Sequence, residues 1–343
     1  MELHFSRTNG AVDDAIDGVI EMVGKIDHPS IVREMILAAL KAGQEGKERI
    51  DLKMMNSTIK EMRFTAKVFN PYQGIRKVTV FGSARTGSSE PLYHLARELG
   101  GRLAQAGYMV ITGGGPGIMQ AMNEGAGPER SFGVNIRLPF EQQVNPVLQG
   151  NPRSVTYKYF FNRKVAFLKE SDAVALFPGG FGTLDEAMET LTLIQTGKRA
   201  PMPVVLMDTP GGTYWRRWVG FVRKELLAKG YINATDFSLF EQVDSAEEAV
   251  AVIGRFYARY HSLRFTGEKL IIRLLSPLEE EAVDSLRRLF TDLLLPGGDF
   301  LSSGAVALDE DEPELAHLPR LIVDFNRKDF ARLRTLIDVI NRS

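Results

Sequence analysis

The chain has 343 residues, of which 44% are hydrophobic and 25% are charged, and this ordinary globular composition excludes disordered and fibrous classes. Lysine and arginine together number 42 and aspartate and glutamate 43, a balance that argues against broad, non-specific nucleic-acid binding. There are no cysteines, which excludes disulfides, cysteine-bound metals and thiol catalysis.

The N-terminus carries no apolar leader, and no apolar run approaches the roughly 20 residues needed to cross a bilayer. We therefore expect a cytoplasmic protein that binds neither membranes nor nucleic acid. The length suggests about two domains, or three smaller ones, at roughly 100–200 residues per domain.

Apolar residues recur at helical spacing through the first seventy residues. Two shorter runs, over 16–23 and 31–40, precede a longer stripe formed by Leu52, Met55, Ile59, Met62, Ala66 and Phe69. The segment Asn70-Pro71-Tyr72 then ends the third helix. We predict a helical N-terminal arm over residues 1–70, whose apolar stripe covers either the next domain or a second subunit.

From residue 77 onward, strands alternate with helices. Short apolar runs predict strands over 78–81, 108–112, 132–136, 155–159, 173–177 and 204–207. Helices are predicted between them, then over 214–227 and over 245–261. Alternation of this kind indicates βαβ units, and continuous apolar strands are typical of a parallel sheet covered on both faces. We predict a Rossmann-like, doubly wound α/β core over residues 71–264.

The last eighty residues have a different pattern. Strands are predicted over 270–272 and 321–323, with an edge strand over 304–308 and a helix over about 282–293. Asn326 is the expected N-cap of a final helix. This β-α-β-β-α order predicts a small α+β module over residues 265–343.

Two glycine clusters each follow a predicted strand and open a helix. They are Gly113-Gly114-Gly115-Pro116-Gly117 and Pro178-Gly179-Gly180-Phe181-Gly182-Thr183. Open α/β sheets bind ligands at the carboxyl ends of their strands, where a helix N-terminus offers free N–H groups to an anion. We predict two phosphate cradles, with Pro116 in the first turn of its helix. Neither cluster has the glycine spacing of a dinucleotide-binding motif or of a P-loop. This disfavours nicotinamide-dependent oxidoreduction and ATP hydrolysis.

Glu186 has two interpretations. The segment Thr183-Leu184-Asp185-Glu186 fits a capping box, in which the glutamate only satisfies helix-end donors. Alternatively, a carboxylate in the first helical turn is kept ionised by the helix dipole. Beside a phosphate cradle, such a group could stabilise positive charge on a sugar ring or hold an attacking water.

Basic residues occur near both cradles. Arg163 could pair with Glu186 or clamp a phosphate, whereas Lys164 fits a solvated basic turn equally well. Arg85, just past the first strand, is a candidate contact for a phosphate or a base. The five histidines are scattered, so neither a histidine metal site nor a Ser-His-Asp triad is predicted.

These motifs resemble those of the Lonely Guy family of nucleoside 5′-monophosphate phosphoribohydrolases, formerly described as lysine decarboxylases. The family motif PGGxGTxxE is present from Pro178 to Glu186, and its arginine-lysine pair is Arg163-Lys164. The family's glycine-rich loop and first-strand end match residues 113–119 and 81–85. The resemblance covers about residues 75–262, and the whole chain is similar to longer bacterial members.

The resemblance implies hydrolysis of the N-glycosidic bond of a nucleoside 5′-monophosphate, which yields free base and ribose 5-phosphate without a cofactor or a metal. It implies catalysis by Arg163 and Glu186. The substrate-binding residues that it implies are Ser83, Arg85, Gly114, Gly115, Gly117, Lys164, Gly179, Gly180, Gly182 and Thr183. Family members are typically dimers, so a homodimer or a higher homo-oligomer is expected. Cytokinin riboside monophosphates and ordinary purine or pyrimidine monophosphates are all candidate substrates.

Two other function classes stay open. Proteins of this fold also carry molybdenum cofactor or bind nucleotides without turnover, and an amino-acid decarboxylase would require pyridoxal phosphate. The presence of both Arg163 and Glu186 favours the hydrolase, because a carrier has no evident need for that pair.

Overall fold

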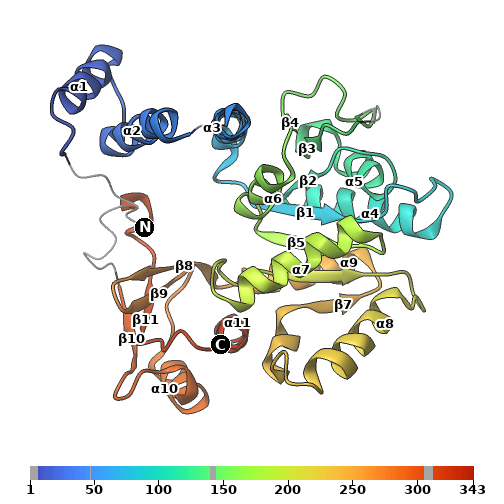
Figure 1. The fold of residues 1–343 in the computed structure, drawn as a ribbon. Coiled ribbons are helices and arrows are strands. Elements are labelled where there is room, and N and C mark those ends of the chain that lie inside the picture. The colour runs from blue at the N-terminus through green and yellow to red at the C-terminus, as the bar shows by residue number, and fades with distance from the viewer. Residues whose placement is uncertain (1–6, 47, 140–143, 305–311) are drawn as a thin grey trace. The chain divides into compact units, whose positions relative to one another are not determined.

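The computed structural model describes residues 7–46, 48–139, 144–304 and 312–343. The chain divides into two compact units, residues 1–63 and 64–343. Figure 1 traces the order of the elements in each unit. Within the described ranges, no helix combines the length and the apolarity that crossing a membrane requires.

The N-terminal arm is helical, as the sequence predicts. It consists of α1 (Ala11–Val23), α2 (Pro29–Glu45) and α3 (Arg49–Phe69). Proline at the first position of α2 suits the helix because the amide hydrogen it lacks would be unpaired there. A buried ion pair between Arg33 and Asp13 joins α2 to α1.

Seven parallel strands form the sheet of the core, in the order β4-β3-β2-β1-β5-β6-β7. The chain winds outward from β1 to β4 and then returns to place β5 on the other side of β1. This arrangement confirms the doubly wound, Rossmann-like fold and puts its topological switch point between β1 and β5. The strands are β1 (Lys77–Phe81), β2 (Met109–Thr112), β3 (Ser131–Ile136), β4 (Ser154–Tyr157), β5 (Ala173–Leu176), β6 (Val204–Met207) and β7 (Glu241–Val243).

Helices cover both faces of this sheet because successive strand residues point to opposite sides. One face packs against α4 (Pro91–Gln105), α5 (Ile118–Ala126) and α9 (Ala246–Phe256). The other packs against α6 (Phe160–Lys169), α7 (Phe181–Gln195) and α8 (Tyr214–Phe221).

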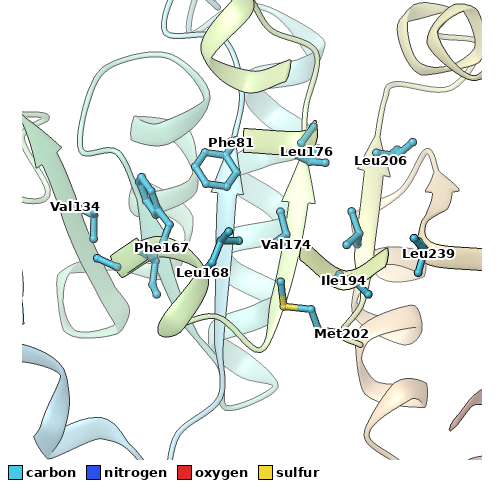
Figure 2. Packing of buried hydrophobic residues seen from close by; sticks show 14 of the residues in the cluster. Phe81, Val134, Phe167, Leu168, Val174, Leu176, Ile194, Met202, Leu206 and Leu239 are labelled. Atoms are coloured by element: carbon cyan, nitrogen blue, oxygen red, sulfur yellow. The ribbon is translucent and has the colours of Figure 1, made fainter. Parts of the chain in front are cut away.

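The second of these layers is the core shown in Figure 2. Phe81 from β1 meets Phe167 from α6 edge to face, with ring centroids 4.8 Å apart. Val174 and Leu176 from β5 point into the same layer, while Ala173 and Ala175 point to the opposite face. The rigid layer fixes the start of α7 relative to the end of β1, and these two segments border the candidate site.

The C-terminal module is an antiparallel sheet in the order β10-β11-β9-β8, with two helices. Its elements are β8 (Tyr260–Thr266), β9 (Lys269–Leu274), α10 (Glu280–Leu289), β10 (Phe300–Ser303), β11 (Arg320–Val323) and α11 (Phe330–Ile340). Three details of the sequence prediction need correction. The helix expected to reach residue 261 ends at Phe256, since Tyr260 starts β8 and pairs with Leu274.

The other two corrections concern the last strands and the final helix. The edge strand is expected over 304–308, but the strand in this region is β10, which ends at Ser303. Residues 305–308 lie outside the described ranges. Asp329, rather than Asn326, caps α11 by accepting a hydrogen bond from the backbone amide of Arg332. The Asn326 amide instead donates to the carbonyl of Asp292.

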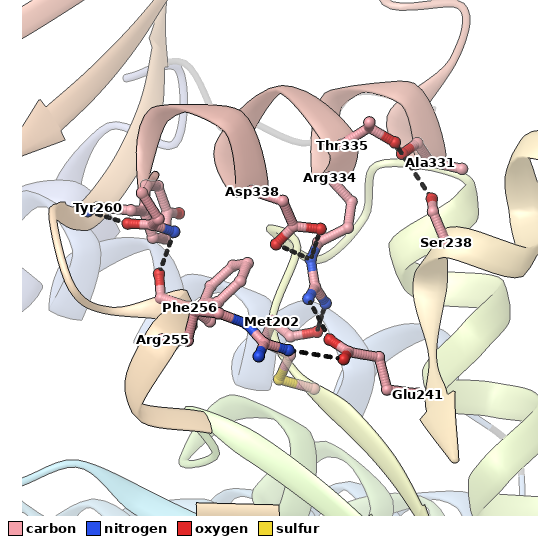
Figure 3. Close-up of polar contacts among 11 residues, drawn as sticks. Met202, Ser238, Glu241, Arg255, Phe256, Tyr260, Ala331, Arg334, Thr335 and Asp338 are labelled. Carbon is pink, nitrogen blue, oxygen red and sulfur yellow. Dashed lines mark hydrogen bonds and ion pairs between the residues drawn. The ribbon is translucent and has the colours of Figure 1, made fainter. Parts of the chain in front are cut away.

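Helix α11 ties this module to the parallel sheet (Figure 3). Arg334, which is 2% exposed, donates to the carbonyl of Met202 and to Glu241 at the edge strand β7. Its Nε also lies 3.1 Å from Oδ1 of Asp338. The Ser238 hydroxyl donates to the carbonyl of Ala331, which is itself part of the core layer of Figure 2. The module therefore completes the packing of the 64–343 unit.

Candidate active site

A cavity of about 860 Å³ opens at the switch point, bordered by the segments that follow β1 and β5. Eight of the residues implied by the sequence line it, namely Ser83, Arg85, Arg163, Gly179, Gly180, Gly182, Thr183 and Glu186. Gly114 and Gly115 line a second cavity of about 190 Å³. The two cavities share Gly113, Met119, Phe160 and Arg163, so they adjoin one another. Gly117 and Lys164 line neither of the two.

The N-terminus of α7 opens into the larger cavity. The helix begins at Phe181 after Gly180, without a side-chain cap, and the amides of Phe181 and Gly182 have no acceptor within the described residues. The Tyr214 hydroxyl fixes this loop by donating to the carbonyl of Gly179 at 2.7 Å. Free amides and the positive end of the helix dipole make this position suitable for an anion.

The capping-box interpretation of Glu186 is wrong. Because α7 starts at Phe181, Thr183 is the third residue of the helix and cannot be its N-cap. Glu186 is the sixth residue and lies in the second turn. The structure thus gives the carboxylate no part in closing the helix end.

The glycine cluster after β2 is closed by the protein itself. Helix α5 begins at Ile118, whose amide donates to the carbonyl of Ser83 at 3.0 Å, so Pro116 precedes the helix instead of lying in its first turn. Gly117 has a φ of 68°, and a Cβ there would overlap Ser83. The backbone amide of Asn145 donates to the carbonyl of Gly114, and the side-chain amide of Asn145 donates to the carbonyl of Gly115. This cluster forms a wall, and the first amide of its helix is already occupied.

Glu186 is buried, with 7% exposure, and lines the larger cavity. Its Oε2 has no hydrogen-bond partner within the described residues. Burial raises the pKa of Glu186 to about 7, and the positive charges of Lys164 and Arg163 only partly offset that rise. Desolvation therefore outweighs the nearby positive charges, and the carboxyl group gains and loses its proton near pH 7.

Lys164 lies behind this carboxylate rather than in a solvated turn. Its Nζ is 2.8 Å from Oδ2 of Asp185, 2.7 Å from Oε2 of Glu189 and 3.7 Å from Oε1 of Glu186. Burial alone lowers the pKa of Lys164, but the hydrogen bonds to Asp185 and Glu189 outweigh it and raise that pKa. The ammonium group therefore stays charged and supplies the compensating charge for a buried acidic group.

Arg163 spans the two cavities. Its Nε donates to the carbonyl of Val134 at 2.9 Å, and its guanidinium passes over Gly113, where a Cβ would overlap it. No ion pair within 4.0 Å joins Arg163 to Glu186 in the described residues, although each shifts the pKa of the other.

Sequence reasoning missed two residues of this region. Tyr214 holds the carbonyl of Gly179, and no motif in the sequence marks it. Asn135 lines the smaller cavity, and its one signal is a polar residue in the apolar strand run 132–136. Within the described ranges, no three His, Asp or Glu side chains are grouped to hold a metal ion.

Comparisons with known proteins match the part of the chain that contains the parallel sheet. Residues 110–253 match the family model described as "Possible lysine decarboxylase". The chain is 26% identical to the cytokinin riboside 5′-monophosphate phosphoribohydrolase LOG1 of Arabidopsis thaliana, over 55% of this chain and 87% of that protein. It is 31% identical to the "Probable cytokinin riboside 5′-monophosphate phosphoribohydrolase LOGL9" of Oryza sativa subsp. japonica, over 51% and 76%. A solved structure of the molybdenum cofactor carrier protein from Chlamydomonas reinhardtii is similar at 19% identity and a TM-score of 0.37, over 53% of this chain and 97% of that one.

Proposed function

Because the chain belongs to the Lonely Guy family, we propose that it hydrolyses the N-glycosidic bond of nucleoside 5′-monophosphates. The products are a free base and ribose 5-phosphate. The observation that carries this proposal is Glu186, a buried carboxylate whose Oε2 has no protein partner, in a cavity that also contains the open N-terminus of α7.

The phosphate binds at the start of α7 in this proposal. The free amides of Phe181 and Gly182 and the side chain of Thr183 lie together at that helix end and line the larger cavity. Arg85 lines the same cavity and is exposed, so its guanidinium can reach the phosphate without breaking an ion pair within the described residues. Phosphate binding positions the ribose over the second turn of the helix, beside Glu186.

Glu186 then assists the attack of water on C1′. The carboxylate takes a proton from the water as the new C1′–O bond forms. The C1′–N bond breaks, its electron pair leaves with the base, and the base takes up the proton that Glu186 received from the water, which regenerates the carboxylate. Positive charge develops on the ribose during this step, and an anionic carboxylate stabilises that charge more in the transition state than in the ground state.

Arg163 fixes the geometry of this step. Its Nε is held by the carbonyl of Val134, so the other guanidinium nitrogens are directed by the fold rather than by the substrate. Because Arg163 lines both cavities, its guanidinium can hold the ribose between them.

The test is incubation of the purified protein with AMP, GMP, CMP, UMP and a cytokinin riboside monophosphate, followed by chromatographic detection of free base. We expect base release from at least one monophosphate and much less from the matching nucleoside, which lacks the phosphate. Glu186→Gln should abolish release. Binding of all five nucleotides with no base released would support the alternative of a nucleotide-binding or cofactor-carrying protein.

A further inference from the structure

Asn135 carries polar atoms that the protein itself does not use. Its side chain on β3 is 6% exposed, and neither Oδ1 nor Nδ2 has a hydrogen-bond partner within the described residues. The proposed hydrolysis does not employ them either. Buried amides are almost always hydrogen-bonded in native proteins, so one without a protein partner indicates a ligand contact.

The surroundings of Asn135 form a defined pocket. It lines the cavity of about 190 Å³, together with the loop 113–115 and Arg163. The remaining walls are apolar and consist of Met119, Ile136, Leu138, Val144 and Phe160. Gly114, with a φ of 71°, allows the loop to lie directly on the amide, because a Cβ at that position would overlap Asn135 Oδ1.

We propose that this smaller cavity binds the nucleobase of the substrate and that Asn135 recognises the polar edge of the base. The inference rests on the proposed function, since it assigns the base of the same substrate. A base has flat apolar faces and an edge of mixed donors and acceptors, which suits apolar walls and one amide. A phosphate fits less well than a base, because the acceptor Oδ1 would face an anion beside five apolar side chains.

The order of the strands supports this orientation of the nucleotide. The start of α7 follows β5, and the pocket lies beyond β1 at the ends of β2 and β3. Three strand spacings separate β5 from β3, a span of about 14 Å that is comparable with the length of a nucleoside monophosphate. Arg163 lines both cavities, and Glu186 lines the one that holds the phosphate site, so the ribose lies between phosphate and base.

The experiment measures equilibrium binding in a Glu186→Gln background, so that turnover does not interfere. AMP, GMP, CMP, UMP and ribose 5-phosphate are titrated by calorimetry into this variant, with and without Asn135→Ala. We expect about tenfold weaker binding of the preferred nucleotide, a smaller spread among the four bases and unchanged binding of ribose 5-phosphate. Asn135→Asp, which replaces the donor by a second acceptor, should shift preference toward bases with an amino group at that edge.

Asn145→Ala is the matched control. Its amide is bonded to the carbonyl of Gly115 and to Asn123, so its loss should lower the melting temperature and weaken every ligand alike. Asn135→Ala should leave the melting temperature nearly unchanged, since it removes no protein hydrogen bond.

Two results would overturn the base assignment. One is unchanged nucleotide affinity in Asn135→Ala, and the other is an equal loss for ribose 5-phosphate, which would place the amide on the sugar or the phosphate. If the proposed function itself is wrong, the outcome differs from both of these results. In that case the wild-type protein releases no base, while Asn135 still governs which nucleotides bind.

Discussion

The ammonium nitrogen of Lys164 lies 3.7 Å from Oε1 of Glu186 and forms shorter contacts with Asp185 and Glu189. Burial raises the pKa of Glu186, while the charge of Lys164 lowers it, and the balance is a pKa of about 7. Lys164 lines neither cavity, so we infer that it acts on the substrate through Glu186. A general base is most effective when its pKa lies near the working pH, which is the condition that this pair produces.

The pH profile of the reaction should show this pair. If the ionised form of Glu186 is the active one, kcat/KM rises with pH and levels off above an apparent pKa near 7. Lys164→Met removes the charge that lowers that pKa, so the acid limb should move to higher pH. Lys169→Met is the control, because Lys169 is an exposed residue of the same helix and pairs only with Glu170 among the described residues. A flat profile between about pH 5 and 8 would contradict the assignment.

Replacing Glu186 should stabilise the protein while it abolishes activity. The folded-state pKa of about 7 lies above the ordinary value of 4.5, so stability present at low pH is lost as pH rises through that interval. Glu186→Gln cannot ionise and escapes this loss. We expect a gain on the order of 1–3 kcal/mol in the free energy of unfolding at about pH 8. Denaturant titrations at pH 5 and pH 8 check this, and equal gains at both pH values would argue against a buried charge.

Much of the fold could be predicted because its signals are local. Continuous apolar runs such as 173–177 predict buried parallel strands, and these occur where expected. The elements that sequence reasoning missed have weak local signals. The edge strand β7 has only three residues, one of them buried, and β8 mixes polar and apolar residues because it belongs to a half-exposed antiparallel sheet.

The sequence predicts which residues form the candidate site, but it does not predict which of the two glycine clusters offers free amides. Two glycine clusters suggested two similar phosphate cradles, yet the amide of Ile118 is occupied by the carbonyl of Ser83 while the amide of Phe181 is free. The difference depends on a contact between segments 35 residues apart in sequence, and no local pattern contains it. The raised pKa of Glu186 is not visible in the sequence for a related reason, since burial is a tertiary property.

Gly113 should be essential for activity because of Arg163. A Cβ at position 113 would overlap the guanidinium, so Gly113→Ala should displace Arg163 and lower kcat at least tenfold, with the protein still folded. Gly254→Ala in α9 is the control, because no atom lies within 4 Å of the added Cβ. Steady-state kinetics and circular dichroism of both variants provide the measurement. Wild-type kcat in Gly113→Ala would show that the position of Arg163 is not critical.

The phosphate site can be tested by removing one amide hydrogen. Proline is tolerated at the first position of a helix, and Gly180 before it is already extended, as a residue preceding proline requires. Phe181→Pro should therefore keep α7 intact and weaken binding of ribose 5-phosphate several-fold. Phe181→Ala keeps the amide and should bind ribose 5-phosphate like the wild type, since Phe181 is 92% exposed. Equal affinities in the two variants would locate the phosphate elsewhere.

Arg334 should determine the stability of the 64–343 unit without contributing to catalysis. It joins α11 to Glu241 and to the carbonyl of Met202 while it is almost fully buried. Arg334→Ala leaves Glu241 and Asp338 without this partner, so we expect a loss of about 3–5 kcal/mol in the free energy of unfolding. Arg332→Met on the same helix should cost less than about 1 kcal/mol, because its ion pair with Asp292 is exposed.

Removal of residues 265–343 tests more severely whether the parallel sheet depends on the C-terminal module. It divides β8, removes its partner strand β9 and exposes the core layer that Ala331 helps to fill. We expect an insoluble product, and solubility on expression together with calorimetric melting is the measurement. A soluble, fully active fragment would show that the module is an accessory and that the contacts of Arg334 do not support the sheet.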